Sequence, residues 1–315
     1  MKTPLILDLD TGIDDTIALF LAATNPDVEL LGVVSTYGNV SAERSAENSL
    51  KILSLAGRDD VPVFVGRRSP LLSDEVFFPD EVSRRIHGEN GTGNVTLPES
   101  GRKPEEKNGI EWLGEMFERY GENLVYVTTG PMTNLASLIL SKPELKSSKC
   151  RVVSMGGALT VRGNVSHFAE ANIHKDPESA KTAFESGLDI SMVGLDVTMR
   201  SRLRISDAEA WRSTGTEAGT ILSDMLLYYI ENTTGTDDTY IHDPSALCCA
   251  LHPEWFTLLS LPLTVETEGS DRGRTVVDGE RILEKNPRAK AAVLVESCRV
   301  ESFVTQGILN RISRR

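Results

Sequence analysis

The sequence predicts an α/β fold with a mostly parallel central sheet flanked by helices, similar to a Rossmann fold. Short apolar runs alternate along the chain with segments of helical period, as in strand–helix–strand units. Polar clusters follow several of these runs, where open parallel sheets bind their ligands. Because 40% of the 315 residues are hydrophobic, the chain can form a large core, and we expect one globular domain over residues 1–315.

The expected elements follow one another in βα order. The strands that the apolar runs predict are residues 5–9, 29–34, 61–65, 123–127, 151–155 and 190–195. The helices that the sequence predicts between them are residues 16–23, 42–55, 135–140 and 177–185. This order favours a parallel sheet with its connecting helices packed on both faces.

Two long polar stretches interrupt the alternation. Residues 69–108 contain several Gly and Pro and few apolar residues, which predicts a mobile loop over the site with a short helix near residues 80–85. Residues 231–240 are also irregular and link an apolar helix at 221–230 with a second one that follows Asp243. Apart from these stretches, polar clusters follow four of the predicted strands, and the loops that carry them can converge on one pocket.

Composition excludes several classes of partner. A net charge of −13 and a pI near 5.0 argue against nucleic acid and anionic membranes, since both require basic patches. The apolar run at the amino terminus is too short for a signal peptide, no window approaches a membrane span, and we expect a cytoplasmic protein. The cysteines lack the spacing of zinc ligands and are expected to be reduced core residues: Cys150, Cys248, Cys249 and Cys298.

The first apolar run leads into four aspartates within eight residues: Asp8, Asp10, Asp14 and Asp15. Alternation places Asp8 and Asp10 on one side of the strand, and Gly12 permits a turn that brings the other two back. Like charges this close need a counter-charge, so the cluster predicts a hard metal ion with oxygen ligands. A single aspartate here would be explained as a helix cap, but four exceed what capping requires.

Weaker signals lie later in the chain. Asp243, before Pro244, is typical of a helix N-cap, although His242 beside it adds a titratable ring. His87 lies in the long polar loop, where a lone histidine is usually solvated. Residues 130–134 form a turn into a helix, and a backbone carbonyl there can reach a metal.

Four further polar side chains suit the hydroxyl groups of a sugar. They are the amides and the carboxylate of Asn39, Asn164, Glu170 and Asn172. Each of these groups can equally well satisfy backbone groups of its own turn.

Taken in order, these motifs resemble the inosine-uridine type nucleoside hydrolases, which cleave the N-glycosidic bond of ribonucleosides. The resemblance covers roughly residues 4–312. Residues 8–15 are similar to the opening DxDxGxDD signature of the family. Other matching segments are residues 37–40, 129–134, 155–157, 163–164, 170–173 with 176–177, 193–198 and 242–243.

The resemblance implies a bound Ca²⁺ and assigns its ligands. These would be Asp10, Asp15, the main-chain carbonyl of Thr129, and Asp243, with ribose hydroxyls and a water completing the shell. Asp10 would also deprotonate this water. Asp8 would be a supporting residue within the strand.

The resemblance also implies how the nucleoside is held. His242 would lie near the leaving base and act in catalysis, and His87 would come from the mobile loop. The ribose would be bound or lined by Asp14, Asn39, Met155, Asn164, Glu170 and Asn172. These roles agree with the chemistry, because ribosyl transfer builds positive charge on the sugar and nearby carboxylates stabilise it. No organic cofactor is needed.

Three positions differ from residues found in the family or in one of its branches. Thr11 stands where Pro is common in the family, and Ala171 stands where some members have Phe, which leaves one pocket wall undefined. His242 replaces the Trp of the purine-stacking branch, so we expect a preference for pyrimidine nucleosides or for inosine and uridine. Tyr228 or Tyr229 either contacts the base or packs within its helix.

Two other functions compete with hydrolysis of nucleosides. A haloacid-dehalogenase-like phosphatase would use Asp8 and Asp10 with Mg²⁺, but the later lysine and acidic pair of that fold are absent from the expected places. A non-catalytic nucleoside-binding protein would have lost the base, yet Asp10 is present. By resemblance alone we expect a homodimer or homotetramer.

Overall fold

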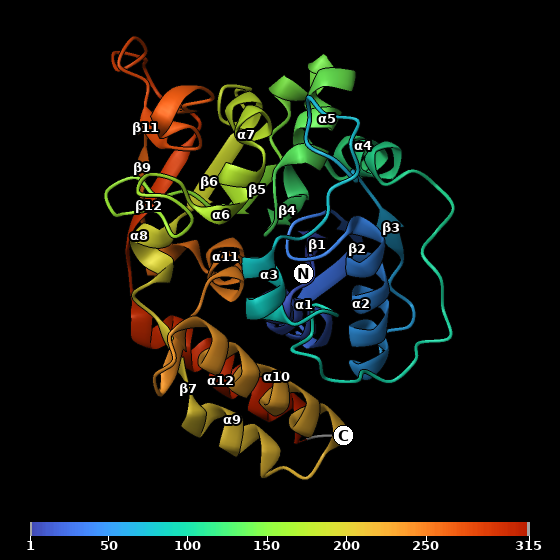
Figure 1. Ribbon diagram of the computed structural model, residues 1–315. Coiled ribbons are helices and arrows are strands. Elements are labelled where there is room, and N and C mark those ends of the chain that lie inside the picture. The colour runs from blue at the N-terminus through green and yellow to red at the C-terminus, as the bar shows by residue number, and fades with distance from the viewer. Residues whose placement is uncertain (1, 314–315) are drawn as a thin grey trace.

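The computed structural model describes residues 2–313 and has a central sheet of eight strands in the order β3-β2-β1-β4-β5-β6-β12-β9 (Figure 1). Neighbouring strands are parallel except β9, which pairs antiparallel with β12 at one edge. The strands of this sheet are β1 (Thr3–Leu9), β2 (Val28–Ser35), β3 (Val63–Val65), β4 (Val125–Thr128), β5 (Arg151–Met155), β6 (Asp189–Val193), β9 (Phe256–Ser260) and β12 (Lys290–Val295). The predicted mostly parallel α/β fold is therefore confirmed.

Two small two-stranded sheets and the helices complete the described residues. The small sheets pair β7 (Arg202–Arg204) with β8 (Asp238–Tyr240), and β10 (Leu263–Val265) with β11 (Thr275–Val277). The α-helices are α1 (Ile13–Thr24), α2 (Ala42–Leu55), α3 (Glu81–His87), α4 (Gly109–Tyr120), α5 (Thr133–Ser141), α6 (Ala171–Lys175), α7 (Pro177–Phe184), α8 (Leu195–Thr198), α9 (Ile205–Arg212), α10 (Glu217–Thr233), α11 (Asp243–Leu251) and α12 (Ser297–Ile312). Short 3₁₀ helices are η1 (Gly121–Asn123), η2 (Pro143–Ser147), η3 (Pro253–Trp255) and η4 (Gly269–Asp271).

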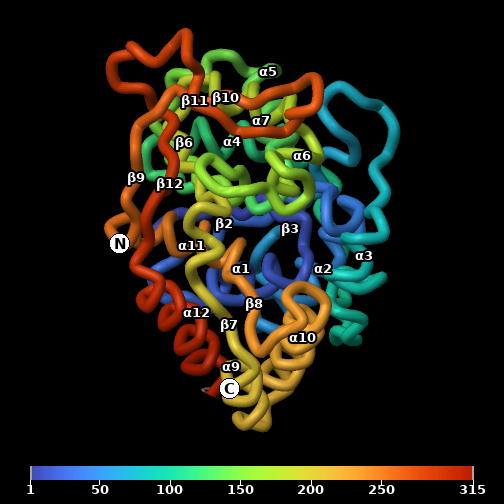
Figure 2. The backbone as a smooth tube through the Cα atoms, turned by 60° about the vertical axis from the view of Figure 1, so that its left-hand side comes forward, coloured from blue at the N-terminus to red at the C-terminus, as the bar shows by residue number. Residues whose placement is uncertain are grey.

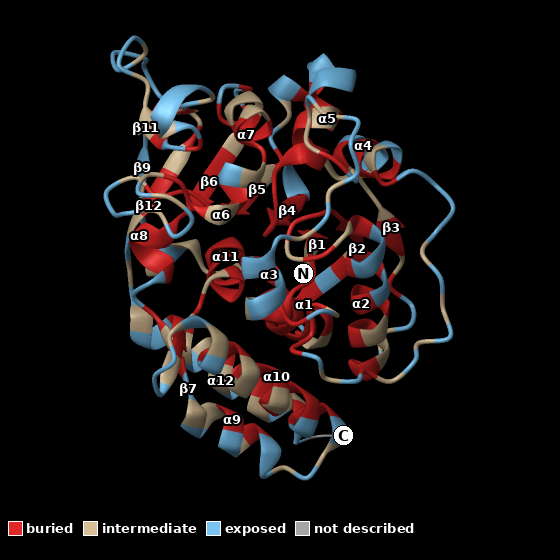
Figure 3. Ribbon diagram, viewed as in Figure 1, coloured by how far each residue is buried: buried red, intermediate tan, exposed pale blue. Residues whose placement is uncertain are grey.

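Alternation along β1 divides the core between the two faces of the sheet. Leu5, Leu7 and Leu9 pack in one buried cluster with apolar residues of α1, α2 and α11, whereas Ile6 packs in a second cluster with α4, α5 and α7. Each fully buried leucine contributes about 2 kcal/mol through removal of apolar surface from water. Figure 3 shows the central strands buried between these helices. In Figure 2, α9, α10 and α12 form a narrower end beyond the sheet.

Most of the predicted elements are present, with shifted ends. Helix α2 and strand β5 have the predicted bounds, whereas α1 begins at Ile13 rather than at residue 16. The short helix in the long loop is α3, and the irregular segment 231–240 includes the last turn of α10 and strand β8. The prediction of four core cysteines is wrong for one of them, because Cys298 is exposed on α12. Within residues 2–313, no helix is long and apolar enough to cross a membrane.

The carboxyl end of β1 brings neighbouring loops together. Thr36 N, just after β2, donates a hydrogen bond to Leu9 O at 2.8 Å, and Thr129 N, just after β4, donates one to Asp8 O at 2.9 Å. Both bonds continue the parallel ladders past the ends of their strands. These bonds therefore fix the first residues of the loops after β1, β2 and β4 relative to one another.

Candidate active site

Four of the predicted aspartates lie together at this edge of the sheet. Asp10 follows β1, Asp14 and Asp15 lie in the first turn of α1, and all are buried. Asp243 joins them from α11, and carboxylate oxygens of Asp14, Asp15 and Asp243 lie within 4.8 Å of one another. The interpretation of Asp243 as an N-cap is wrong, because it is the first residue of the helix and His242 occupies the cap.

Asn39 links the two parts of the aspartate cluster. Its backbone N donates to Asp10 Oδ2 at 2.7 Å, and its Nδ2 donates to Asp15 Oδ2 at 3.1 Å. Asp15 also accepts from Gly12 N at 2.8 Å, which is a capping interaction. Asp15 therefore caps α1 and belongs to the cluster at the same time, so the two explanations are not exclusive.

Burial without counter-charge raises the pKa values of the cluster. Burial first, and then the charge of Asp15, raise the pKa of Asp10 well above its ordinary value and that of Asp14 to about 7. Burial and the charges of Asp14 and Asp15 likewise raise the pKa of Asp243. A divalent cation would remove this penalty, because it would favour the ionised form of every carboxylate.

The available oxygen atoms fit a hard cation. Asp10 Oδ1 and Asp14 Oδ1 are buried and have no hydrogen-bond partner among the described residues. The carbonyl of Thr129 accepts one hydrogen bond, from Asn172 Nδ2 at 2.6 Å, which leaves its second lone pair. Carboxylate and carbonyl oxygens are the ligands that Ca²⁺ prefers. The acidic cluster can therefore hold a metal ion.

Gly38 packs directly against Asp10. A Cβ atom at Gly38 would lie 2.0 Å from Asp10 Oδ2, closer than any real contact. We therefore expect Gly38→Ala to displace the Asp10 carboxylate and to lower kcat/KM by about a hundredfold, the usual cost of a misplacement of about 1 Å. Steady-state kinetics of ribose release from the nucleosides that the resemblance implies would test this expectation. As a control, Gly279→Ala has open space around its Cβ and no left-handed backbone, and it should leave kcat/KM unchanged.

Asp8 belongs to the support of the site. It accepts hydrogen bonds from Tyr126 Oη and, at 2.9 Å, from Asn134 Nδ2. Burial raises the pKa of Asp8 to about 7, although both hydrogen bonds oppose the shift. Asn134 Nδ2 also donates to Ser35 O at 3.2 Å, so this aspartate helps to join the ends of β1, β2 and β4.

Of the residues predicted to bind ribose, Asn39 contacts the cluster directly, and Asn172 is connected to it through Thr129. Asn172 Nδ2 donates to the carbonyl of Met155 at 3.2 Å as well as to Thr129, and Glu170 caps α6 and accepts from Gly157 N at 3.0 Å. Burial raises the pKa of Glu170. Asn164 is exposed, and its side chain accepts from Ala171 N at 3.0 Å, which is the turn-forming role that the sequence left open.

His87 is not solvated, so the expectation for a lone loop histidine is wrong. It is the last residue of α3 and is buried, and its Nδ1 accepts a hydrogen bond from Ile13 N at the start of α1, at 3.2 Å. Burial lowers the pKa of His87 to about 3, so the ring is neutral at neutral pH. Since Nδ1 is an acceptor, the proton of the ring resides on Nε2.

His242 is half-buried beside the cluster. Its Nδ1 forms a hydrogen bond with Thr198 Oγ1 at 2.9 Å, which fixes the orientation of the ring. Burial, and then the charge of Arg202, lower the pKa of His242 to about 4. The ring is therefore neutral at neutral pH and retains one N–H donor.

Tyr229 has a role in the site that sequence reasoning left undecided. Its Oη donates to Asp14 Oδ2 at 3.2 Å, and its ring centroid lies 5.6 Å from that of His87. Tyr228 points elsewhere and donates to Arg85 O at 3.2 Å. The helical period places only one of two adjacent tyrosines on the inner face of α10, but the sequence does not show which one.

Fold and site together define an α/β protein with a buried carboxylate cluster, able to hold a metal ion, at the carboxyl edge of its parallel sheet. The family model described as inosine-uridine preferring nucleoside hydrolase matches residues 5–305, and the chain belongs to this family. Membership of this family excludes the haloacid-dehalogenase-like phosphatase.

Relatives of known activity differ in their preferred base. The pyrimidine-specific ribonucleoside hydrolase RihA of Escherichia coli O9:H4 is 36% identical over 301 residues, which cover 94% of this chain and 95% of the relative. RihA of Klebsiella pneumoniae is 36% identical over 309 residues, with 96% of each chain covered. Among solved structures, a purine-preferring ribonucleoside hydrolase from Gardnerella vaginalis has a TM-score of 0.96 and 38% identity, covering 99% of this chain and 100% of its own.

Proposed function

We propose that this hydrolase converts ribonucleosides to ribose and free base with the help of Ca²⁺ held by Asp10, Asp15, Asp243 and the carbonyl of Thr129. The observation that carries the proposal is the buried aspartate cluster with unpartnered oxygens on Asp10 and Asp14. When bound, Ca²⁺ would supply a fixed position for water and ribose hydroxyls and would make that water more acidic.

In the proposed mechanism Asp10 is the general base. Its Oδ2 is fixed by the backbone N of Asn39 at 2.7 Å, whereas its Oδ1 is free to accept a proton from the attacking water. The attack forms the bond from oxygen to the anomeric carbon while the N-glycosidic bond breaks. The negative charge of the aspartates stabilises the oxocarbenium-like transition state that develops on the sugar.

The ribose would be oriented by the surrounding polar groups. Asp14 has a free Oδ1 and is held by Tyr229, so it can accept a hydrogen bond from a ribose hydroxyl. Further hydrogen bonds and contacts to the sugar are proposed for Asn39, Met155, Asn164, Glu170 and Asn172. Such a network would fix the anomeric carbon against the attacking water.

Two neutral histidines are available to the leaving base. His242 uses Nδ1 for Thr198, which leaves Nε2 for the base, and His87 uses Nδ1 for the Ile13 amide. A hydrogen bond to the departing nitrogen base lowers the barrier because negative charge builds up there. We propose His242 as the catalytic partner of the base and His87 as a binding residue.

We propose a preference for pyrimidine nucleosides or for inosine and uridine. The support is His242 in place of the Trp of the purine-stacking branch, together with the pyrimidine-specific activity named for the RihA relatives. The alternative is a preference for purine nucleosides, as named for the relative from Gardnerella vaginalis.

A panel of nucleosides tests the proposed function. Ribose release from uridine, cytidine, inosine, adenosine and guanosine would be measured with purified protein and Ca²⁺, and uridine or inosine should have the highest kcat/KM. Guanosine or adenosine ranking first would overturn the proposed preference. Nucleoside binding without ribose release would overturn the proposed catalysis and favour a binding protein.

We also propose that the protein acts in the cytoplasm, in nucleoside salvage, as a homodimer or homotetramer. The support is the family to which the chain belongs. Light scattering coupled to gel filtration would give the mass of the assembly, and a monomer would refute this proposal.

A further inference from the structure

The small β7–β8 sheet leads directly into two residues of the proposed site. Ile241, His242 and Asp243 follow β8 directly, and Ile241 N donates to Ser201 O at 3.1 Å, just before β7. This two-stranded sheet lies outside the central one, and α9 and α10 connect its strands rather than a tight turn. Since two strands are only marginally stable by themselves, other elements must fix their position.

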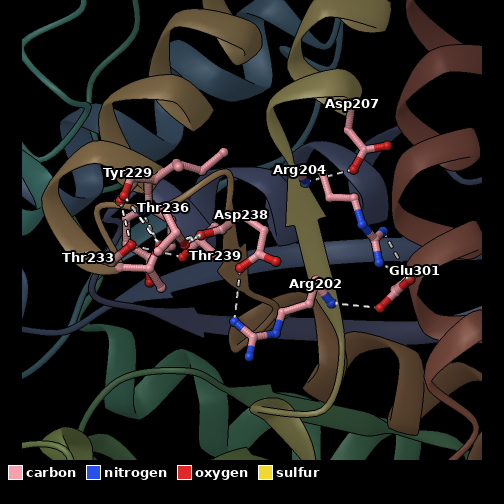
Figure 4. Close-up of polar contacts among 11 residues, drawn as sticks. Arg202, Arg204, Asp207, Tyr229, Thr233, Thr236, Asp238, Thr239 and Glu301 are labelled. Carbon is pink, nitrogen blue, oxygen red and sulfur yellow. Dashed lines mark hydrogen bonds and ion pairs between the residues drawn. The ribbon is translucent and has the colours of Figure 1, made fainter.

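One carboxylate on the C-terminal helix α12 binds both ends of β7 (Figure 4). Glu301 Oε1 accepts from the backbone N of Arg202 at 2.9 Å, and Oε2 accepts from Arg204 Nη1 and Nη2 at 3.1 and 3.2 Å. The side chain of Glu301 is only 19% exposed. A partly buried, charge-assisted set of bonds such as this restrains a strand more than a surface ion pair does.

From Arg202 the contacts continue to the site. Its Nη1 donates to Asp238 Oδ1 on β8 at 3.0 Å, and its guanidinium lies over the ring of Tyr240, 3.9 Å from the centroid. The ring of Tyr240 in turn lies 5.8 Å from that of His242, centroid to centroid. A continuous chain of packed groups therefore runs from Glu301 to the two site residues after β8.

Helix α10 holds the other side of β8. Thr233 Oγ1 forms a hydrogen bond with Thr239 Oγ1 at 2.9 Å and donates to the carbonyl of Tyr229 at 2.6 Å (Figure 4). Tyr229 contacts Asp14 of the cluster. β8 thus has one support that is itself attached to the cluster, while Glu301 supplies a polar attachment of β7 to α12 beside the apolar packing of Leu203.

We propose that Glu301 is a positioning residue that fixes the β7–β8 sheet and thereby helps to hold Asp243 against the aspartate cluster. The inference rests on the proposed role of Asp243 as a calcium ligand. Without the carboxylate, the backbone N of Arg202 and the guanidinium of Arg204 lose their acceptor, so the sheet loses its polar attachment to α12 and keeps the apolar packing of Leu203 and Ile241 in the core. Direct hydrogen-bond partners of metal ligands contribute tenfold or more to metal affinity, and because Glu301 acts through the sheet, we expect an effect at the lower end of this range.

Three variants separate the parts of the Glu301 contact. Glu301→Ala removes every bond, Glu301→Gln keeps an acceptor for the backbone N of Arg202, and Arg204→Ala removes only the ion pair. We expect Glu301→Ala to raise the Kd for Ca²⁺ about tenfold and to lower kcat, with the other two variants within about threefold of wild type. Calorimetric titration of metal-stripped protein with CaCl₂ gives the Kd, and nucleoside kinetics give kcat and KM separately.

The control breaks a similar ion pair away from the site. Asp189→Ala removes the pair with Lys290, whose side chains are 28% and 30% exposed, at the amino end of β6. Equal calcium affinities of Glu301→Ala and Asp189→Ala would overturn the inference. If Glu301→Ala does not fold, Glu301→Met replaces it, because Met keeps the length of the side chain without its carboxylate acceptor, and an unchanged calcium affinity of that variant would equally overturn the inference. Wild-type protein that binds no Ca²⁺ would instead refute the proposed function itself.

Discussion

Asp10→Asn is expected to lower kcat for ribonucleoside hydrolysis by about a thousandfold, within the range that a general base contributes. The carboxylate is buried, and its Oδ1 has no partner among the described residues, so this oxygen is free to take the proton. The amide has nearly the same shape, and its oxygen can still accept from Asn39 N, which leaves an NH₂ group toward the water. Single-turnover ribose release with saturating uridine and Ca²⁺ measures the chemical step.

Asp8→Asn is the matched control for Asp10→Asn. Asp8 lies two residues earlier on the same side of β1 and is equally buried, but its partners are Tyr126 and Asn134. An amide there faces two donors, so we expect a loss of about 1–3 kcal/mol in the free energy of unfolding and a kcat within about tenfold of wild type. If Asp10→Asn kept more than a tenth of the wild-type kcat, Asp10 would not be the base.

Removal of calcium should abolish activity and destabilise the protein. A ligand present at a thousand times its Kd stabilises the folded state by about 4 kcal/mol. For a chain of 315 residues this corresponds to a fall in the thermal midpoint of about 6 °C when EGTA removes the metal. Differential scanning calorimetry and ribose release before and after EGTA would measure both effects, and added CaCl₂ should restore them.

The effect of EGTA should depend on pH. In the metal-free protein the pKa of Asp14 is raised from 3.8 to about 7, so the folded state binds more protons than the unfolded state between these values. Its stability therefore falls as pH rises through this window and is lowest above pH 7. We expect EGTA to lower the thermal midpoint more at pH 8 than at pH 5. Full activity and an unchanged midpoint in EGTA at pH 8 would refute a structural metal site.

The sequence allowed the sheet and the aspartate cluster to be predicted because both depend on local patterns. β1 is a run of mostly buried apolar residues, and Asp10 follows it directly. The apolar run was sufficient to predict the strand, and the position of Asp10 after it was sufficient to place this carboxylate at the end of the strand. The neighbouring strands follow from the βα alternation, since parallel strands place their carboxyl ends at one edge. The ligand set was inferred from the resemblance to a family, and its role stays a prediction.

The parts that could not be predicted depend on contacts between distant segments. His87 is buried because α3 packs against the start of α1, and no local pattern in the polar loop 69–108 indicates this packing. Asp243 precedes Pro244 as a helix cap would, and only the position of α11 beside α1 places it in the cluster. The bond from Tyr229 to Asp14 depends on the same long-range packing.

The aspartate cluster joins residues that lie far apart in the sequence. Asp10, Asp14 and Asp15 are among the first residues that leave the ribosome, whereas Asp243 follows only after β6 and α10 have been made. β1 also needs β4 as its neighbour in the sheet, and α1 is contacted by α12, the last helix. A growing chain therefore lacks the complete aspartate cluster until residue 243 of 315 has been added, and the contact of α1 with α12 forms only when the last helix has been made.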